Sequence, residues 1–225
     1  MNAASPGRVE LLDELARIDH SFLRANDRCW YLAEYVSGAG SRVGSVNQLI
    51  ANLKCSPSVA ATNPRRRRHK RRAMEELAAA LREAVSRSWA EGATWIPIPP
   101  SRSAGDCNYD DRLVHILRKA FAGYDTDIRT VLFQLESMTA DHCNPRRIGI
   151  QWLFERIRVS WSVLASRPLR DELVLFDDVL TTGKHYRCCE RRLRDALPNI
   201  PISGLFVARR VLQGRGRRMP LGGSG

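Results

Sequence analysis

In the second half of the chain, short apolar runs alternate with longer amphipathic stretches. Unbroken apolar runs predict buried strands at Trp95–Ile98, Thr130–Leu135, Leu173–Phe176 and Ile202–Ala208. The amphipathic stretches predict helices at Tyr109–Phe121, Ile148–Leu164 and Tyr186–Leu197. Strands that alternate with helices usually form a parallel sheet with right-handed connections. We therefore expect an α/β fold with a parallel-sheet, Rossmann-like core over residues 93–210.

The patterns before this core are mainly helical. An apolar stripe predicts one helix over Val9–Val36, and a shorter helix is expected over Val46–Leu53 with Ser45 as its N-cap. A linker containing Pro and Ser is expected over Lys54–Pro64, followed by an amphipathic helix at Met74–Trp89. We expect a helical N-terminal region at residues 1–92 and a flexible basic tail at residues 211–225.

The formal net charge of +12 and the isoelectric point near 10.1 indicate attraction to phosphates, whether on nucleotides or on nucleic acid. No apolar run approaches the roughly 18–20 residues that span a bilayer, so we expect no membrane segment and a cytoplasmic location. The six cysteines are scattered and are best explained as free thiols. A zinc site from Cys107, His142, Cys143 and His185 is a weaker alternative.

Seven cations crowd into eight residues in the middle of the N-terminal region: Arg65, Arg66, Arg67, Arg68, Lys70, Arg71 and Arg72. Such a run fits a contact with a nucleic-acid backbone, and the basic tail offers a second one. A solvated charge block at the start of a helix explains the run equally well. Because cations oppose the helix dipole at this end, we expect the ordered helix to begin close to Ala73.

The most informative stretch is Leu173–His185, an apolar strand followed by Asp177-Asp178, Thr181-Thr182-Gly183 and a polar helix. Ligands of open α/β sheets bind outside the carboxyl ends of the strands, and a helix start favours anions. Thr hydroxyls and a Gly suit a phosphate, while two carboxylates suit ribose hydroxyls or Mg²⁺. The plain alternative is a strand–turn–helix junction with Thr as N-cap and the Asp pair in the turn.

The segment FDDVLTTG resembles the 5-phosphoribosyl-1-pyrophosphate (PRPP) binding motif of type I phosphoribosyltransferases. The resemblance implies that Asp177 and Asp178 hold the ribose hydroxyls, directly or through Mg²⁺. It also implies a loop for the 5-phosphate, formed by Thr181, Thr182, Gly183, Lys184 and His185. The family usually has a small residue and then Thr or Ser after this Gly, so Lys184 and His185 are a departure. Their N–H groups would replace the missing hydroxyl as donors to the anion. The alternatives are that the loop binds another ligand or that the enzyme has lost turnover.

Trp95–Asp106 resembles the first core strand and pyrophosphate loop of the same family, most narrowly of competence protein F-type members. By this resemblance, Ser101 and Arg102 face the leaving pyrophosphate. A family loop that closes over the site would offer Thr139, Asp141, His142, Arg146 and Arg147, although a solvated helix start explains the two arginines as well. The resemblance covers the second half of the chain, and the cysteine-based zinc finger usual at the front of competence F-type proteins is missing.

Two functions from different classes follow. The first is a Mg²⁺-dependent phosphoribosyltransferase that binds PRPP, or a related nucleotide, and releases pyrophosphate. The second is a regulatory or nucleic-acid-binding protein that uses the same pocket as a sensor, as purine repressors do. A competence-like or defence-associated protein that acts near nucleic acid would combine them. The acceptor is not evident in the sequence, and a homodimer or larger assembly stays open.

Overall fold

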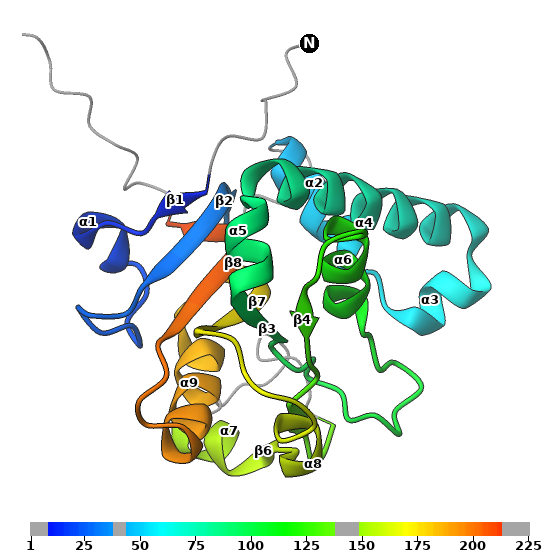
Figure 1. The fold of residues 1–225 in the computed structure, drawn as a ribbon. Coiled ribbons are helices and arrows are strands. Elements are labelled where there is room, and N and C mark those ends of the chain that lie inside the picture. The colour runs from blue at the N-terminus through cyan, green and yellow to red at the C-terminus, as the bar shows by residue number, and fades with distance from the viewer. Residues whose placement is uncertain (1–8, 38–43, 138–148, 213–225) are drawn as a thin grey trace, which may run out of the picture.

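The computed structural model describes residues 9–37, 44–137 and 149–212. Its main sheet has the strand order β1-β2-β8-β7-β3-β4 (Figure 1). The six strands are β1 (Glu10–Leu11), β2 (Cys29–Val36), β3 (Ala93–Pro97), β4 (Asp127–Ile128), β7 (Glu172–Leu180) and β8 (Ile202–Val211). All neighbouring strands are parallel except β1, which runs antiparallel to β2. The chain therefore has an α/β fold with a mostly parallel sheet, as expected.

Helices cover both faces of this sheet. One hydrophobic cluster contains residues of α2 (Ser45–Leu53), α4 (Pro64–Ala84) and α6 (Arg112–Ala120), and it includes Val174 and Phe176 of β7. A second cluster contains residues of α7 (Ile150–Arg156) and α9 (Lys184–Ala196), and it includes Leu173 and Leu175. Alternate side chains of β7 thus enter opposite cores, which explains its unbroken apolar run. No described helix has both the length and the apolar character needed to cross a membrane.

The helix predicted over Val9–Val36 is wrong. This segment holds β1, the short helix α1 (Glu14–Arg17) and β2, and β2 pairs in parallel with β8. In β2, Cys29 and Tyr31 enter one cluster while Trp30 and Leu32 pack on the other, which is the alternation of a strand. Strands from both sides of the predicted domain boundary, between residues 92 and 93, therefore belong to one sheet.

The cationic run is helical, so the predicted start near Ala73 is also wrong. α4 begins at Pro64, and the side chain of Asn63 caps it by accepting a hydrogen bond from the Arg66 N–H at 3.1 Å. The expected linker contains α3 (Pro57–Thr62), and the helix expected to end at Trp89 is divided into α4 and α5 (Arg87–Gly92). A cap and an N1 proline outweigh the unfavourable dipole term here.

The helix predicted over Ile148–Leu164 is wrong in its second half. After α7 the chain forms β6 (Ile157–Val159) and then the short helix α8 (Trp161–Leu164). β6 pairs antiparallel with β5 (Leu132–Gln134) in a separate two-stranded ribbon. The strand predicted at Thr130–Leu135 therefore exists but does not join the main sheet, where the two-residue β4 takes the edge beside β3.

A buried ion pair joins the edge of the sheet to the segment that leads into β7. Asp127 and Arg129 have side chains only 2% exposed, with 2.6 Å between carboxylate and guanidinium. Asp127 also accepts a hydrogen bond from the Thr94 hydroxyl at 2.8 Å, and Arg129 donates to the Leu164 and Pro168 carbonyls at 2.6 Å each. The pair therefore fixes β3, β4 and the approach to β7 relative to one another.

We predict that Arg129→Ala lowers the free energy of unfolding by about 3 kcal/mol, because it removes the buried guanidinium and leaves the buried Asp127 carboxylate with only Arg167 and the Thr94 hydroxyl. The measurement is urea denaturation at neutral pH. Arg170→Ala is the matched control, since Arg170 pairs at 2.9 Å with Asp125, whose side chain is 84% exposed; we expect it to change stability little. Equal effects of the two substitutions would contradict the structural role of the buried pair.

Candidate functional site

A cleft of about 1240 Å³ lies at the carboxyl ends of β3 and β7. The chain leaves β3 through α6 and leaves β7 through α9, and these helices belong to the two opposite hydrophobic clusters. β3 and β7 are neighbours whose following strands, β4 and β8, lie on opposite sides of them. The order of strands thus reverses between β3 and β7. Such a switch point is where open α/β sheets bind ligands.

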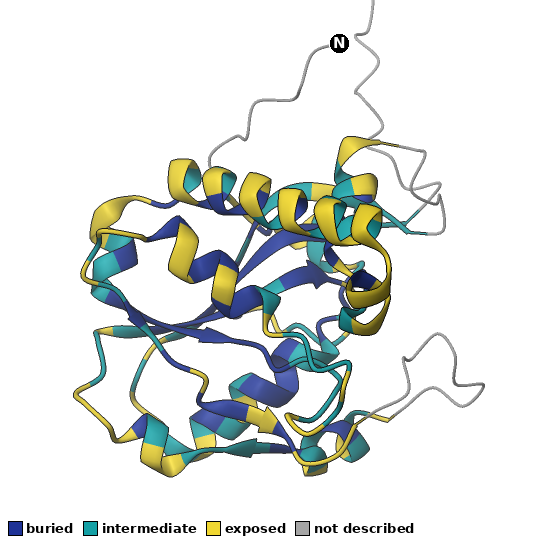
Figure 2. Ribbon diagram, turned by 90° about the vertical axis from the view of Figure 1, so that its right-hand side faces the viewer, coloured by how far each residue is buried: buried dark blue, intermediate teal, exposed yellow. Residues whose placement is uncertain are grey.

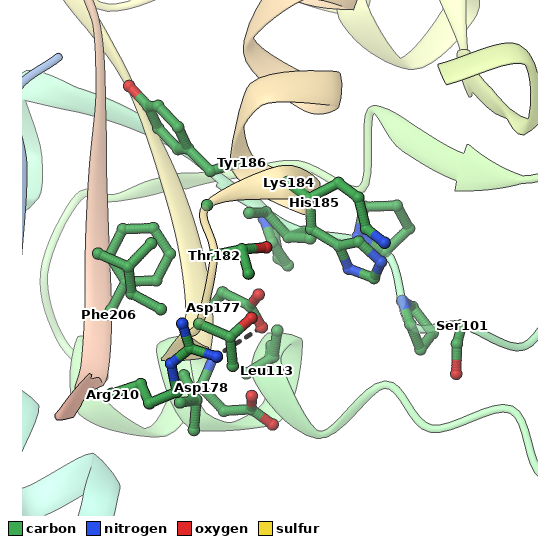
Figure 3. A pocket seen from close by; sticks show the side chains of 18 of the residues that line it. Ser101, Leu113, Asp177, Asp178, Thr182, Lys184, His185, Tyr186, Phe206 and Arg210 are labelled. Carbon is green, nitrogen blue, oxygen red and sulfur yellow. Dashed lines mark hydrogen bonds between the residues drawn. The ribbon is translucent and has the colours of Figure 1, made fainter. Parts of the chain in front are cut away.

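The predicted phosphate loop lines this cleft in full, from Thr181 to His185, together with Asp177, Asp178 and Ser101 (Figure 3). Gly183 has a φ of 80° and precedes the first residue of α9. A Cβ at this position would lie 2.8 Å from the Leu23 side chain. The loop therefore requires Gly for its left-handed backbone and for its close contact with the N-terminal segment.

The N-terminal segment before β2 holds this loop in place. The Phe22 N–H donates to the Thr182 carbonyl at 2.9 Å, and the His20 Nδ1 hydrogen-bonds the Thr181 carbonyl. Since a carbonyl only accepts, His20 Nδ1 must donate and carry the proton. Burial, aided by the charges of Arg209 and Arg210, lowers the pKa of His20 and favours the neutral ring. This contact could not be predicted from sequence pattern, since it joins residues 161 positions apart.

Asp178 is buried and bound by two cations. Its carboxylate lies 2.6 Å from the Arg112 guanidinium and 3.2 Å from the Lys54 ammonium, and its side chain is 4% exposed. Burial opposes its ionisation, but the charges of Lys54 and Arg112 outweigh burial and lower the pKa of Asp178. Lys54, at the end of α2, and Arg112, at the start of α6, are site residues that the sequence analysis missed.

Asp177 differs from its neighbour. Its carboxylate is half-buried and accepts a hydrogen bond from the Asp178 N–H at 2.7 Å. Burial and then the charge of Asp178 raise the pKa of Asp177 to about 7. The two adjacent acids thus have opposite tendencies: Asp178 is a fixed anion, whereas Asp177 can exchange a proton near neutral pH.

An alternating chain of charges connects this pair to α4. Arg112 also contacts Asp110 at 2.8 Å, and Asp110 contacts Lys70 of α4 at 2.6 Å. The Lys70 ammonium donates in addition to the Cys55 carbonyl at 2.7 Å. Lys70 therefore belongs to a buried network that supports Asp178, although the sequence grouped it with the cationic run.

Arg102 is placed differently from the other predicted site residues. It is not among the described residues that line the cleft, and its guanidinium pairs with Asp106 at 3.4 Å. The candidates Thr139, Asp141, His142, Arg146 and Arg147 lie outside the described residues, as does Cys143 of the alternative zinc site. Cys107, the other cysteine of that site, is exposed as a free thiol.

The donor set for Mg²⁺ is small. Within the described ranges, no group of three or more His, Cys, Asp and Glu side chains could hold a metal ion. Mg²⁺ is commonly bound by one or two carboxylates together with substrate phosphates. Asp177 fits this mode, because its carboxylate lines the cleft while Asp178 is already paired. The residues present therefore fit a metal ion that arrives with a phosphorylated ligand.

No protein-family model matches this sequence, and no curated protein matches it either. The function must therefore be argued from the cleft itself.

The opposite pKa shifts predict opposite effects of two substitutions. Asp177 binds a proton more tightly in the folded chain than in the unfolded chain. Its contribution to the free energy of unfolding is therefore fully present below its unfolded pKa of about 4 and is lost as pH rises through its folded pKa of about 7. Because the amide of Asn does not ionise, Asp177→Asn does not lose stability in this way as pH rises. We expect the variant to exceed wild type in unfolding free energy at pH 8, on the order of 1 kcal/mol, and to match it near pH 4.

Asp178→Asn should act in the other direction. The lowered pKa of Asp178 stabilises the fold above its unfolded pKa, and this contribution is lost as pH falls. The variant leaves Lys54 and Arg112 without their shared anion, so we expect lower stability than wild type at pH 8 and a smaller difference in acid. The contribution of Asp178 is lost between its unfolded pKa of about 4 and its folded pKa of about 2. Urea denaturation from pH 2 to pH 8 therefore measures both variants, and parallel profiles would contradict the assignment.

Proposed function

We propose that this protein is a phosphoribosyltransferase-like enzyme. It binds PRPP, or a nucleotide containing ribose 5-phosphate, together with Mg²⁺, and it transfers the phosphoribosyl group with release of pyrophosphate. One observation supports this most: the acid pair and the Thr-Thr-Gly loop, which requires its left-handed Gly183, meet at the switch point of a parallel sheet. The motif thus lies at the carboxyl ends of the strands, which is where a phosphorylated ligand of an open α/β sheet would bind.

In this proposal, the loop after β7 anchors the 5-phosphate. The Thr181 and Thr182 hydroxyls and the backbone at the start of α9 are donors, and Lys184 adds a positive charge beside them. Hydrogen bonds from the His20 ring and the Phe22 N–H hold the loop from behind. Binding energy from a phosphate remote from the reacting carbon can then be used to position the sugar.

Asp177 and Asp178 lie beside this loop at the end of β7. Asp177 is the carboxylate that would accept hydrogen bonds from ribose hydroxyls or contact Mg²⁺, because Asp178 is already bound by Lys54 and Arg112. Mg²⁺ would neutralise charge on the departing pyrophosphate. Lys54 lines the cleft and its side chain is 46% exposed, and its ammonium has three N–H donors, so it can contact that leaving group while it pairs with Asp178. Ser101 lies at the end of β3 across the same cleft.

The first test is titration calorimetry of PRPP with Mg²⁺, followed by a pyrophosphate-release assay over bases, nucleosides and oligonucleotides. We predict that the double variant Asp177→Asn, Asp178→Asn loses PRPP binding while its circular dichroism spectrum stays that of wild type. Binding and release by wild type would establish the transferase. Binding without release would favour the sensor function, and unchanged binding by the double variant would refute the site.

A single hydroxyl provides a finer test. We predict that Thr182→Val weakens PRPP binding about tenfold or more, since a hydrogen bond to a charged group contributes roughly 1.5–3 kcal/mol. Thr182→Ser keeps the hydroxyl and should restore most of the affinity. Thr62→Val is the control, because Thr62 lies in α3, is exposed and does not line the cleft. Equal affinities of the Val and Ser variants at position 182 would rule out a phosphate contact there.

A further inference from the structure

A second concave surface lies between α4 and α6, which run side by side against the same hydrophobic cluster (Figure 1). This groove has a volume of about 620 Å³. Cationic side chains dominate its lining, which consists of Arg67, Lys70, Arg71, Met74 and Glu75 from α4 and His115, Arg118 and Lys119 from α6. The α4 residues recur at helical spacing, so they share one face of the helix. None of these eight residues lines the cleft described above.

The cations of this groove fall into two groups. Two have acidic partners on the protein: Lys70 pairs with Asp110, and Lys119 lies 3.6 Å from Glu75. Beside the groove, Arg72 pairs with Glu76 at 2.8 Å. Arg67, Arg71 and Arg118 are exposed and have no ion pair within the part of the chain that the structure describes. Arg65 and Arg68 are also exposed and without an ion pair among the described residues, but they do not line the groove. The unneutralised guanidinium groups of the groove are thus those of Arg67, Arg71 and Arg118.

The shape of this surface favours an extended polyanion over a compact ligand. α4 contains the cationic run Arg65–Arg72 in its first half, and at roughly 1.5 Å per residue this run is about 12 Å long. The outward face of α4 is exposed along its length (Figure 2). Guanidinium groups bind phosphate oxygens in a bidentate manner, and a row of them matches the repeated charges of a phosphodiester chain.

The groove is poorly suited to an acidic peptide or to the reading of bases. Met74 is its one apolar residue, and none of the described lining residues is a Trp or Tyr of the kind that anchors a protein partner. No Trp, Tyr or Phe is among the described residues of its lining, so bases would find no aromatic side chain for stacking. Contacts limited to phosphates bring affinity without sequence information.

We propose that the groove between α4 and α6 is a nucleic-acid interface that binds the phosphate backbone without sequence preference. This inference is independent of PRPP binding, since the two sites share no lining residue. It also revises the role of the cationic run. Arg67 and Arg71 are contacts, α6 contributes Arg118, and Lys70 is excluded because it supports Asp110.

The test is fluorescence anisotropy with a labelled single-stranded DNA of about 30 nucleotides and with its duplex, over a salt series. The variant carries Arg67→Gln, Arg71→Gln and Arg118→Gln, which keep the helical side-chain stems. We expect its affinity to fall about tenfold or more at roughly 100 mM salt, and the slope of log K against log salt to decrease by about 2–3. Oligonucleotides of scrambled sequence should bind equally well.

The matched control removes three exposed cations elsewhere: Arg24→Gln, Arg28→Gln and Arg191→Gln. It changes the net charge by the same amount, so we expect it to retain most of the wild-type affinity and salt slope. Equal weakening by both triple variants would overturn the proposal, because net charge alone would explain binding. Failure of wild type to bind either oligonucleotide would overturn it too, as would displacement of DNA by polyglutamate at equal charge concentration. Circular dichroism and PRPP titration check that each variant keeps its fold and its cleft.

Discussion

The site depends on the ionised carboxylate of Asp178, which is buried where β7 ends. A buried charge is tolerated only with close partners, and Asp178 has two, Lys54 at 3.2 Å and Arg112 at 2.6 Å. These cations come from α2 and α6, so the N-terminal region supplies half of the compensation. The front of the chain thus contributes to the candidate site as well as to the hydrophobic cluster that covers the sheet. The candidate site is therefore a product of the whole chain, although its motif occupies nine residues from Asp177 to His185.

The same ion pairs separate the roles of the two acids. Asp178 has its charge balanced by the protein, so it acts mainly by its effect on its neighbour. It opposes ionisation of Asp177, whose half-buried carboxylate remains available to the cleft. A cation brought by a ligand would favour the ionised form of Asp177. Ligand binding and proton release at Asp177 are thus expected to be linked, which is a property of the pair and not of either residue alone.

The local pattern of apolar and polar residues was enough to predict strands that are buried on both faces and helices with one apolar face. β3, α9 and β8 lie within a few residues of their predicted positions, because the strands are buried and α9 has one apolar side. β7 was predicted at its start but runs to Leu180, so Asp177 and Asp178 lie inside the strand and not after it, because pairing with β8 continues past the acids. The failures have a common cause. In Val9–Val36 the apolar residues were assigned to one helical face, yet Leu15 is 80% exposed and Ile18 is 63% exposed. β2 is a strand because β8 offers it an edge, and partner strands are not visible in a local window.

The residues of the cleft show the same division between local and long-range information. The acid pair and the loop from Thr181 to Gly183 lie within seven residues of one another, so their chemistry could be inferred from spacing alone. Lys54, Arg112 and His20 could not, because each reaches the loop or the acid pair from a distant part of the sequence. Nor could composition separate the two uses of positive charge. Lys70 and Arg71 are adjacent in sequence, but one neutralises Asp110 and the other faces solvent. The net charge of +12 therefore includes cations that neutralise buried carboxylates near the cleft and cations that face solvent at the groove between α4 and α6. Only the ion pairs of individual residues distinguish the two kinds.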